Sequence, residues 1–165
     1  MANILCFSRN RCTSVEQIND QTIRSSCRLQ DTLMDAFVEI TVQLPDLEIT
    51  KVKGELTRSP WQEDLNTVES LQKVIGIRVG PGIKKIIKGL MGETKGNKQL
   101  AFMVEECCNG VILSFTKDVL LKAPRDKVNK KEFYACLVKE NIRLYNRCAA
   151  FAPGSPLVEG IESPE

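Results

Sequence analysis

The chain has 165 residues, enough for one domain with a core of its own, and its 42% apolar and 27% charged residues are typical of a globular protein. It contains no histidine, which excludes a Ser-His-Asp triad, a Cys-His catalytic pair and any histidine-ligated metal site. The formal net charge of +2 gives no case for a nucleic acid or a membrane surface as partner, although residues 71–131 are rich in lysine and arginine.

The first half of the chain is predicted to form four strands, at residues 3–9, 21–29, 36–44 and 47–56. The last two alternate apolar and polar side chains, which is the period of a half-buried strand. A turn at Pro45 separates them, so we expect an antiparallel hairpin. The apolar face changes near Gly54, where we expect a bulge.

Helical periodicity replaces this alternation after Pro60, and four helices are predicted, at residues 66–74, 80–88, 97–121 and 130–148. Pro81 suits the first turn of the second helix because its missing N–H costs nothing there. Gly110 either kinks the third helix or lets it pack closely, and Asn129 is placed to cap the fourth. The apolar face of the third helix contains Leu100, Val104, Cys107, Cys108, Val111 and Phe115.

Strands first and helices after indicate the α+β class. We expect an N-terminal antiparallel sheet of about four strands, packed on one face by three to four C-terminal helices. Residues 1–150 form this single domain, and residues 151–165, rich in proline, glycine and acidic residues, are predicted to be a disordered tail.

The cysteine content indicates a reducing compartment. There are seven cysteines, an odd number, and no Cys-x-x-Cys pair, so neither a disulfide framework nor a zinc ribbon is predicted. The N-terminal residues lack the apolar stretch of a signal peptide. We therefore expect a cytoplasmic protein.

The start of the second predicted helix is a candidate anion site. Gly80 and Gly82 would expose backbone N–H groups, and Lys84 and Lys85 would add positive charge where the helix dipole is already positive. A phosphate group, an acidic partner surface or bulk water would compensate this charge. An ordinary helix start with solvated lysines is the alternative.

Cys107 is a candidate of another kind. Its place on the apolar face predicts that it packs in the core, and the acidic residues Glu105 and Glu106 beside it argue against a reactive thiolate. The alternative is a metal or iron–sulfur site formed by Cys107 with carboxylates, for which Asp31 and Asp64 are the candidates.

Residues 29–120 resemble the uncharacterised bacterial family catalogued as domain of unknown function two-eight-eight-nine. The resemblance is carried by FVEITVQLPDLEITKVKGEL, RSPWQED, LQKVIGIRVGPGIKKIIKGLMG and GNKQL. Where the family has a cysteine after the proline and a Gly-Cys-x-His-Leu helix start, this chain has Asp64, Asn97 and Gln99. The order of elements is also loosely similar to that of the scaffold proteins of iron–sulfur assembly, a likeness that concerns architecture alone.

These observations favour a small non-catalytic accessory or binding subunit of a larger bacterial enzyme system, without a cofactor. The expected partner is another protein subunit with an acidic surface. Two alternatives stay open: a metal or iron–sulfur carrier that uses Cys107, and an anion-binding module or enzyme that acts through residues 80–88.

Overall fold

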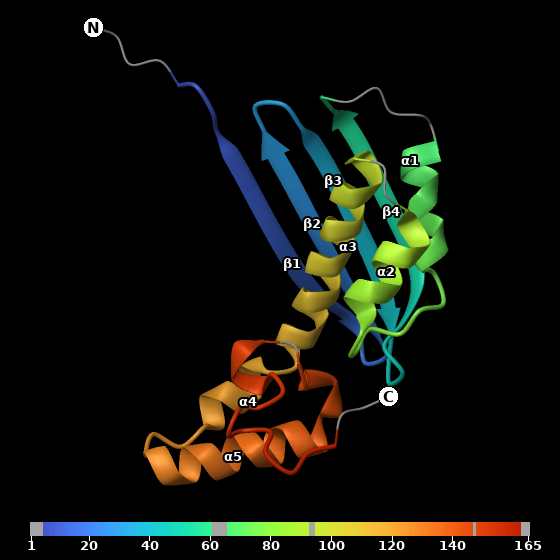
Figure 1. The fold of residues 1–165 in the computed structure, drawn as a ribbon. Helices are drawn as coiled ribbons and strands as arrows, with labels where there is room; N and C mark the ends of the chain where they lie inside the picture. Colours follow the sequence, from blue (N-terminus) through green and yellow to red (C-terminus); the bar gives the residue numbers. More distant parts are fainter. Residues whose placement is uncertain (1–4, 61–65, 93–94, 147, 163–165) are drawn as a thin grey trace, which may run out of the picture. The chain divides into compact units, whose positions relative to one another are not determined.

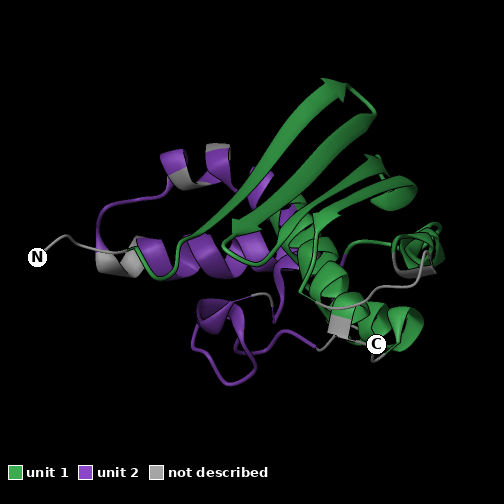
Figure 2. Cartoon of the chain, turned by 90° about the horizontal axis from the view of Figure 1, so that it is seen from above, with its two compact units in different colours: residues 1–79, 83–111 green, residues 80–82, 112–165 purple. Residues whose placement is uncertain are grey.

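The computed structural model describes residues 5–60, 66–92, 95–146 and 148–162. The chain falls into two compact units, residues 1–79 with 83–111 and residues 80–82 with 112–165, which Figure 2 colours separately. The first unit contains the sheet with the helices that cover it, and the second contains the last helices. The predicted α+β class, with one antiparallel sheet followed by helices, is confirmed.

Four strands form the sheet in the order β1-β2-β3-β4 (Figure 1). Their bounds are Arg9–Asn19 for β1, Thr22–Asp31 for β2, Asp35–Gln43 for β3 and Glu48–Arg58 for β4. Every second side chain of β2 and β3 is buried, because helices cover one face of the sheet and leave the other in water. The last three predicted strands are therefore confirmed.

The first strand lies later in the chain than predicted. Residues 5–8 are not in a strand, residues 3 and 4 lie outside the described residues, and β1 begins at Arg9. Its side chains are exposed except for the half-buried Val15, so no apolar alternation marks it in the sequence. Pairing with β2 from Arg9 to Asn19, with one irregularity at Ile18, makes this polar segment a strand.

The predicted bulge at Gly54 is wrong. The register of β3 against β4 skips one residue at Thr50 and one at Thr57, while Gly54 lies directly opposite Val38. The alternation of buried side chains in β4 therefore shifts by one residue at Thr50, between the buried Ile49 and Val52. The glycine at position 54 serves packing instead, because a Cβ there would collide with Cδ1 of Leu71.

The helical elements of the described residues are α1 (Asn66–Glu69), η1 (Ser70–Val74), α2 (Ile83–Met91), α3 (Lys95–Ser114), α4 (Lys117–Lys122), α5 (Lys127–Glu140), η2 (Ile142–Leu144) and η3 (Ala149–Phe151), where η marks a 3₁₀ turn. The helix predicted at 66–74 is confirmed, with a 3₁₀ second half.

Gly82 has a positive φ of 77°, so α2 begins only after it. The prediction that Pro81 lies in the first helical turn is wrong.

Gly110 lets α3 pack closely on the sheet, which is one of its two predicted roles. A Cβ at this position would lie 2.9 Å from Cγ2 of Val15, 3.2 Å from Cγ2 of Thr13 and 3.3 Å from Oγ of Ser25. The predicted apolar face of this helix is confirmed as buried at Leu100, Val104, Cys107, Cys108 and Val111.

The helix predicted at 97–121 is interrupted. The N–H of Thr116 donates to the carbonyl of Leu113 at 3.0 Å, and the Thr116 hydroxyl donates to the same oxygen at 2.7 Å. These bonds end α3, and Phe115 is exposed rather than buried on its apolar face.

The last part of the chain also differs from the prediction. Asn129 lies within α5 rather than before it, and Cys148, the last residue of the helix predicted at 130–148, lies beyond α5 and is exposed. Turns occupy much of the segment 151–162, which was predicted as part of a disordered tail, and Val158 in it is buried.

Candidate functional site

Cys107 is a core residue of the first unit, as predicted. It is fully buried, its thiol lies 3.7 Å from the carbonyl oxygen of Val38, and its own carbonyl accepts a 2.9 Å hydrogen bond from the hydroxyl of Ser25. Burial raises the pKa of the Cys107 thiol far above its usual range, and the neighbouring thiols of Cys27 and Cys108 raise it further. Because a metal ligand must be a thiolate, this environment disfavours metal binding.

Replacing Cys107 with alanine is expected to lower the free energy of unfolding by about 1 kcal/mol, since a small buried side chain is deleted. Urea denaturation of the variant measures this change. Cys12→Ala, at an exposed cysteine of β1, is the matched control and should leave the midpoint unchanged. Loss of bound iron or zinc from Cys107→Ala, with an unchanged midpoint, would contradict the packing role.

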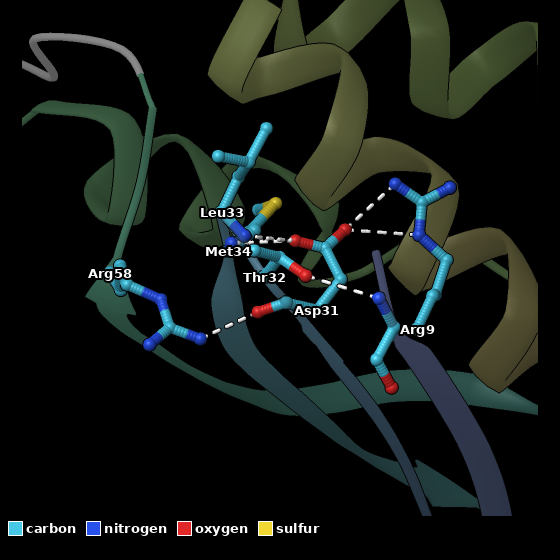
Figure 3. A network of polar contacts seen from close by, with 7 residues as sticks. Arg9, Asp31, Thr32, Leu33, Met34 and Arg58 are labelled. Carbon is cyan, nitrogen blue, oxygen red and sulfur yellow. Dashed lines mark hydrogen bonds and ion pairs between the residues drawn. The ribbon is translucent and has the colours of Figure 1, made fainter. Parts of the chain in front are cut away.

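Asp31 closes the turn between β2 and β3 (Figure 3). Its Oδ1 accepts the N–H groups of Leu33 at 2.8 Å and Met34 at 2.7 Å, and its Oδ2 accepts Nε and Nη2 of Arg9 at 3.0 and 2.7 Å. The hydrogen bonds from Arg9 hold the pKa of Asp31 below its usual value against the opposing effect of burial, and the two backbone N–H groups lower it further. Both carboxylate oxygens are thus occupied by the fold itself.

The structure does not bring the candidate metal ligands together. Cys107 lies against Val38, which pairs with Cys27, and Asp31 is four residues further along β2, about 13 Å at the rise of a strand. Asp64 lies outside the described residues. Within the described part of the chain, no three cysteine or carboxylate side chains are grouped to hold a metal ion.

The predicted anion site at the start of α2 has a different environment from the one expected. Gly80 is buried rather than exposed, and only Gly82 is exposed. The exposed Lys84 lies 3.9 Å from the carboxylate of the buried Glu105 on α3. The chain itself therefore supplies a negative charge for Lys84, and Lys85 remains exposed.

A second group of cations lies between β1 and α3 and forms a hollow with a volume of about 660 Å³. We call it the arginine hollow; its lining residues are Arg9, Arg11, Leu29, Gln99 and Phe102. In the antiparallel pairing, Arg9 lies opposite Asp31 and Arg11 lies opposite Leu29 of β2. Directly opposite residues share a face of the sheet, and both partners are buried, so the two arginine side chains lie on the helix-covered face.

Each guanidinium of the hollow is held by neighbours and is still half exposed. The Arg11 guanidinium lies over the ring of Phe102, 5.1 Å from its centroid, and its Nε is 3.6 Å from the Glu106 carboxylate. The Arg9 and Arg11 side chains are 57% and 49% exposed. A guanidinium has five N–H donors, and one carboxylate neighbour does not saturate them. The hollow therefore presents positioned donors beside the half-buried ring of Phe102.

No local sequence signal marks the arginine hollow, because the hollow depends on the position and register of β1. Arg9 stood at the end of a predicted strand and Arg11 outside it, so their common face was not visible. Of the positions that the family resemblance singled out, Gln99 lines the hollow. Asn97 ties α3 to α2 instead, because its Nδ2 donates to the carbonyl of Met91 at 2.7 Å.

Comparison of the chain with protein-family models, with curated proteins and with solved structures gave no match. Among the described residues, no helix is both long enough and apolar enough to cross a membrane. None of the seven cysteines, all at described positions, is in a disulfide bond.

Proposed function

We propose that the protein is a non-catalytic accessory subunit that binds an acidic segment of a partner protein in the arginine hollow. One observation carries the proposal: Arg9 and Arg11, on one face of an exposed strand, present half-exposed guanidinium groups beside the ring of Phe102. Guanidinium groups recognise carboxylates through paired hydrogen bonds.

The surroundings favour a carboxylate on a side chain over a bare phosphate. The half-buried ring of Phe102 offers apolar surface to the stem of a glutamate or aspartate, above the buried Leu29. Each arginine already has a carboxylate neighbour, Asp31 or Glu106, so the net positive charge that holds a free phosphate tightly is reduced.

The bacterial enzyme system and the cytoplasmic location are parts of the same proposal. The first follows from the family resemblance. The second is supported by thiols that stay reduced in the core, since buried cysteines outside disulfides are usual in a reducing compartment.

The test uses the full chain and a hexaglutamate peptide, with inorganic phosphate as the second probe, in isothermal titration calorimetry at low salt. We expect the peptide to bind, and to bind more weakly as salt rises because the arginines are exposed. Arg11→Gln should weaken peptide binding about tenfold, the equivalent of one charge-assisted hydrogen bond.

Lys85→Gln is the matched control, because it removes an exposed cation at the rival site on α2. Its affinity for the peptide should equal that of the original chain, and both variants should keep the melting temperature. If Lys85→Gln weakens binding and Arg11→Gln does not, the helix start is the anion site. Absence of peptide binding, or tighter binding of phosphate, would overturn the proposal.

A further inference from the structure

We propose that β1 is a strand-addition site: an extended partner segment with acidic residues at alternate positions pairs antiparallel with the open edge of this strand. The inference rests on the proposed function, because the acidic side chains of the added strand would occupy the arginine hollow. It further specifies the backbone conformation, direction and residue spacing of the partner.

The two edges of the sheet differ in how they are covered. Among the strands of the described residues, β1 has β2 as its only neighbour. At the other edge, the backbone of 76–79 bonds to the start of β4, with the N–H of Ile49 donating to Ile77 at 2.9 Å and that of Gly76 to Ile49 at 2.8 Å. β1 is 11 residues long and contains neither proline nor lysine, which commonly protect an edge strand from pairing. Its register irregularity lies between Gln17 and Asn19, at the end of the strand away from Arg9 and Arg11.

The alternation of an antiparallel ladder shows which backbone groups of β1 point outward. The carbonyl of Ser8 accepts the N–H of Thr32 at 3.1 Å, so the backbone of Ser8 faces β2. Every second residue repeats this direction. The N–H and C=O groups of Arg9, Arg11 and Thr13 consequently face the open edge.

The same residues therefore offer both kinds of contact. Arg9 and Arg11 present outward backbone groups for a ladder, and their guanidinium groups lie on the helix-covered face. In an added antiparallel strand, the residues opposite them are two positions apart and share that face, with Cβ atoms about 5 Å from those of the arginines. Glutamates in a Glu-x-Glu arrangement are placed to reach both guanidinium groups.

Charge favours such a partner over a second copy of this chain. The one acidic residue of β1 is Glu16, and its even position puts it on the face opposite to Arg9 and Arg11. When two β1 strands pair, side chains on the same face of each strand lie beside one another. The Glu16 side chain of one copy therefore does not meet Arg9 and Arg11 of the other.

The experiment titrates the full chain with the peptide acetyl-Thr-Ser-Glu-Val-Glu-Ser-Thr-amide and with its isomer that carries adjacent glutamates, Thr-Ser-Glu-Glu-Val-Ser-Thr. Composition and charge are identical, but the isomer turns one carboxylate to the other face. We expect the Glu-x-Glu peptide to bind about tenfold more tightly, a difference of one charge-assisted contact.

Backbone methylation tests the ladder itself. In the proposed pairing the N–H of the second glutamate points toward β1 and that of the central valine points away. N-methylation of the glutamate should weaken binding about tenfold or more, whereas N-methylation of the valine should leave it unchanged.

Three outcomes would overturn the inference, and they separate it from the proposed function. Equal binding of both N-methylated peptides, still sensitive to Arg11→Gln, removes strand addition and keeps the acidic partner. Binding insensitive to Arg11→Gln removes the proposed function too. A dimer seen by light scattering without peptide, dissociated by Thr13→Pro, would show that a second copy occupies the edge.

Discussion

Gly54→Val is expected to lower the free energy of unfolding by about 3 kcal/mol, the upper range for overpacking a core. Gly54 lies opposite Val38 in the sheet, and its Cβ position is filled by the side chain of Leu71, which is fully buried. The backbone at Gly54 is not in the left-handed region, so the cost arises from packing between β4 and η1. Urea denaturation gives the value.

The double variant Gly54→Val with Leu71→Ala separates this account from a general weakening of the strand. Removing the Leu71 side chain makes room for valine, so Gly54→Val should cost much less in that background. Gly89→Ala is the control for a glycine with nothing near its Cβ position, and it should raise stability by about 0.5–1 kcal/mol through helix propensity. An equal cost of Gly54→Val in both backgrounds would contradict the packing account.

The parts of the fold that the sequence predicts are those in which burial follows a simple period. Strand β3 alternates apolar and polar residues because one face packs and the other is in water. The apolar face of α3 follows the helical period for the same reason. In both elements the pattern of side chains reports the environment directly.

The break between α3 and α4 was not predictable from this signal. Apolar residues continue across the junction, at Ile112, Leu113, Phe115 and Val119, so the period alone indicates one helix. The break depends on the hydrogen bonds that Thr116 makes to Leu113. A threonine hydroxyl can bond to a nearby backbone carbonyl both inside a helix and at its end. A threonine in the sequence therefore does not show whether the helix continues or stops.

The candidate site shows the same limit. The sequence predicts an acidic partner at the start of α2, whereas the site that we propose for one lies between β1 and α3. The side chains of β1 are exposed apart from the half-buried Val15, so no apolar pattern in the sequence reveals the strand register that brings Arg9 and Arg11 together. At the start of α2, the charge of Lys84 is balanced by Glu105, a residue 21 positions away in the chain, which no local motif indicates.

Asp31→Ala is expected to lower the free energy of unfolding by about 2 kcal/mol at neutral pH, because Arg9 loses its carboxylate and the N–H groups of Leu33 and Met34 lose their acceptor. Asp31→Asn keeps an oxygen for the two N–H groups and should recover part of this loss. Asp46→Ala, at an exposed turn position, is the control and should change stability by less than about 0.5 kcal/mol.

The effect of Asp31 should depend on pH in one direction. The folded protein holds the pKa of Asp31 below the ordinary value of 3.8, so the folded state binds this proton less readily than the unfolded state. The ionised carboxylate then contributes its full stabilisation above about pH 5, and the contribution falls as the pH drops below 3.8 and through the lower folded-state pKa. Urea denaturation at pH 7, 5 and 3 should give equal differences between the original chain and Asp31→Asn at the first two values and a smaller one at pH 3. A difference that grows on acidification would mean that Arg9 does not stabilise the ionised form of Asp31.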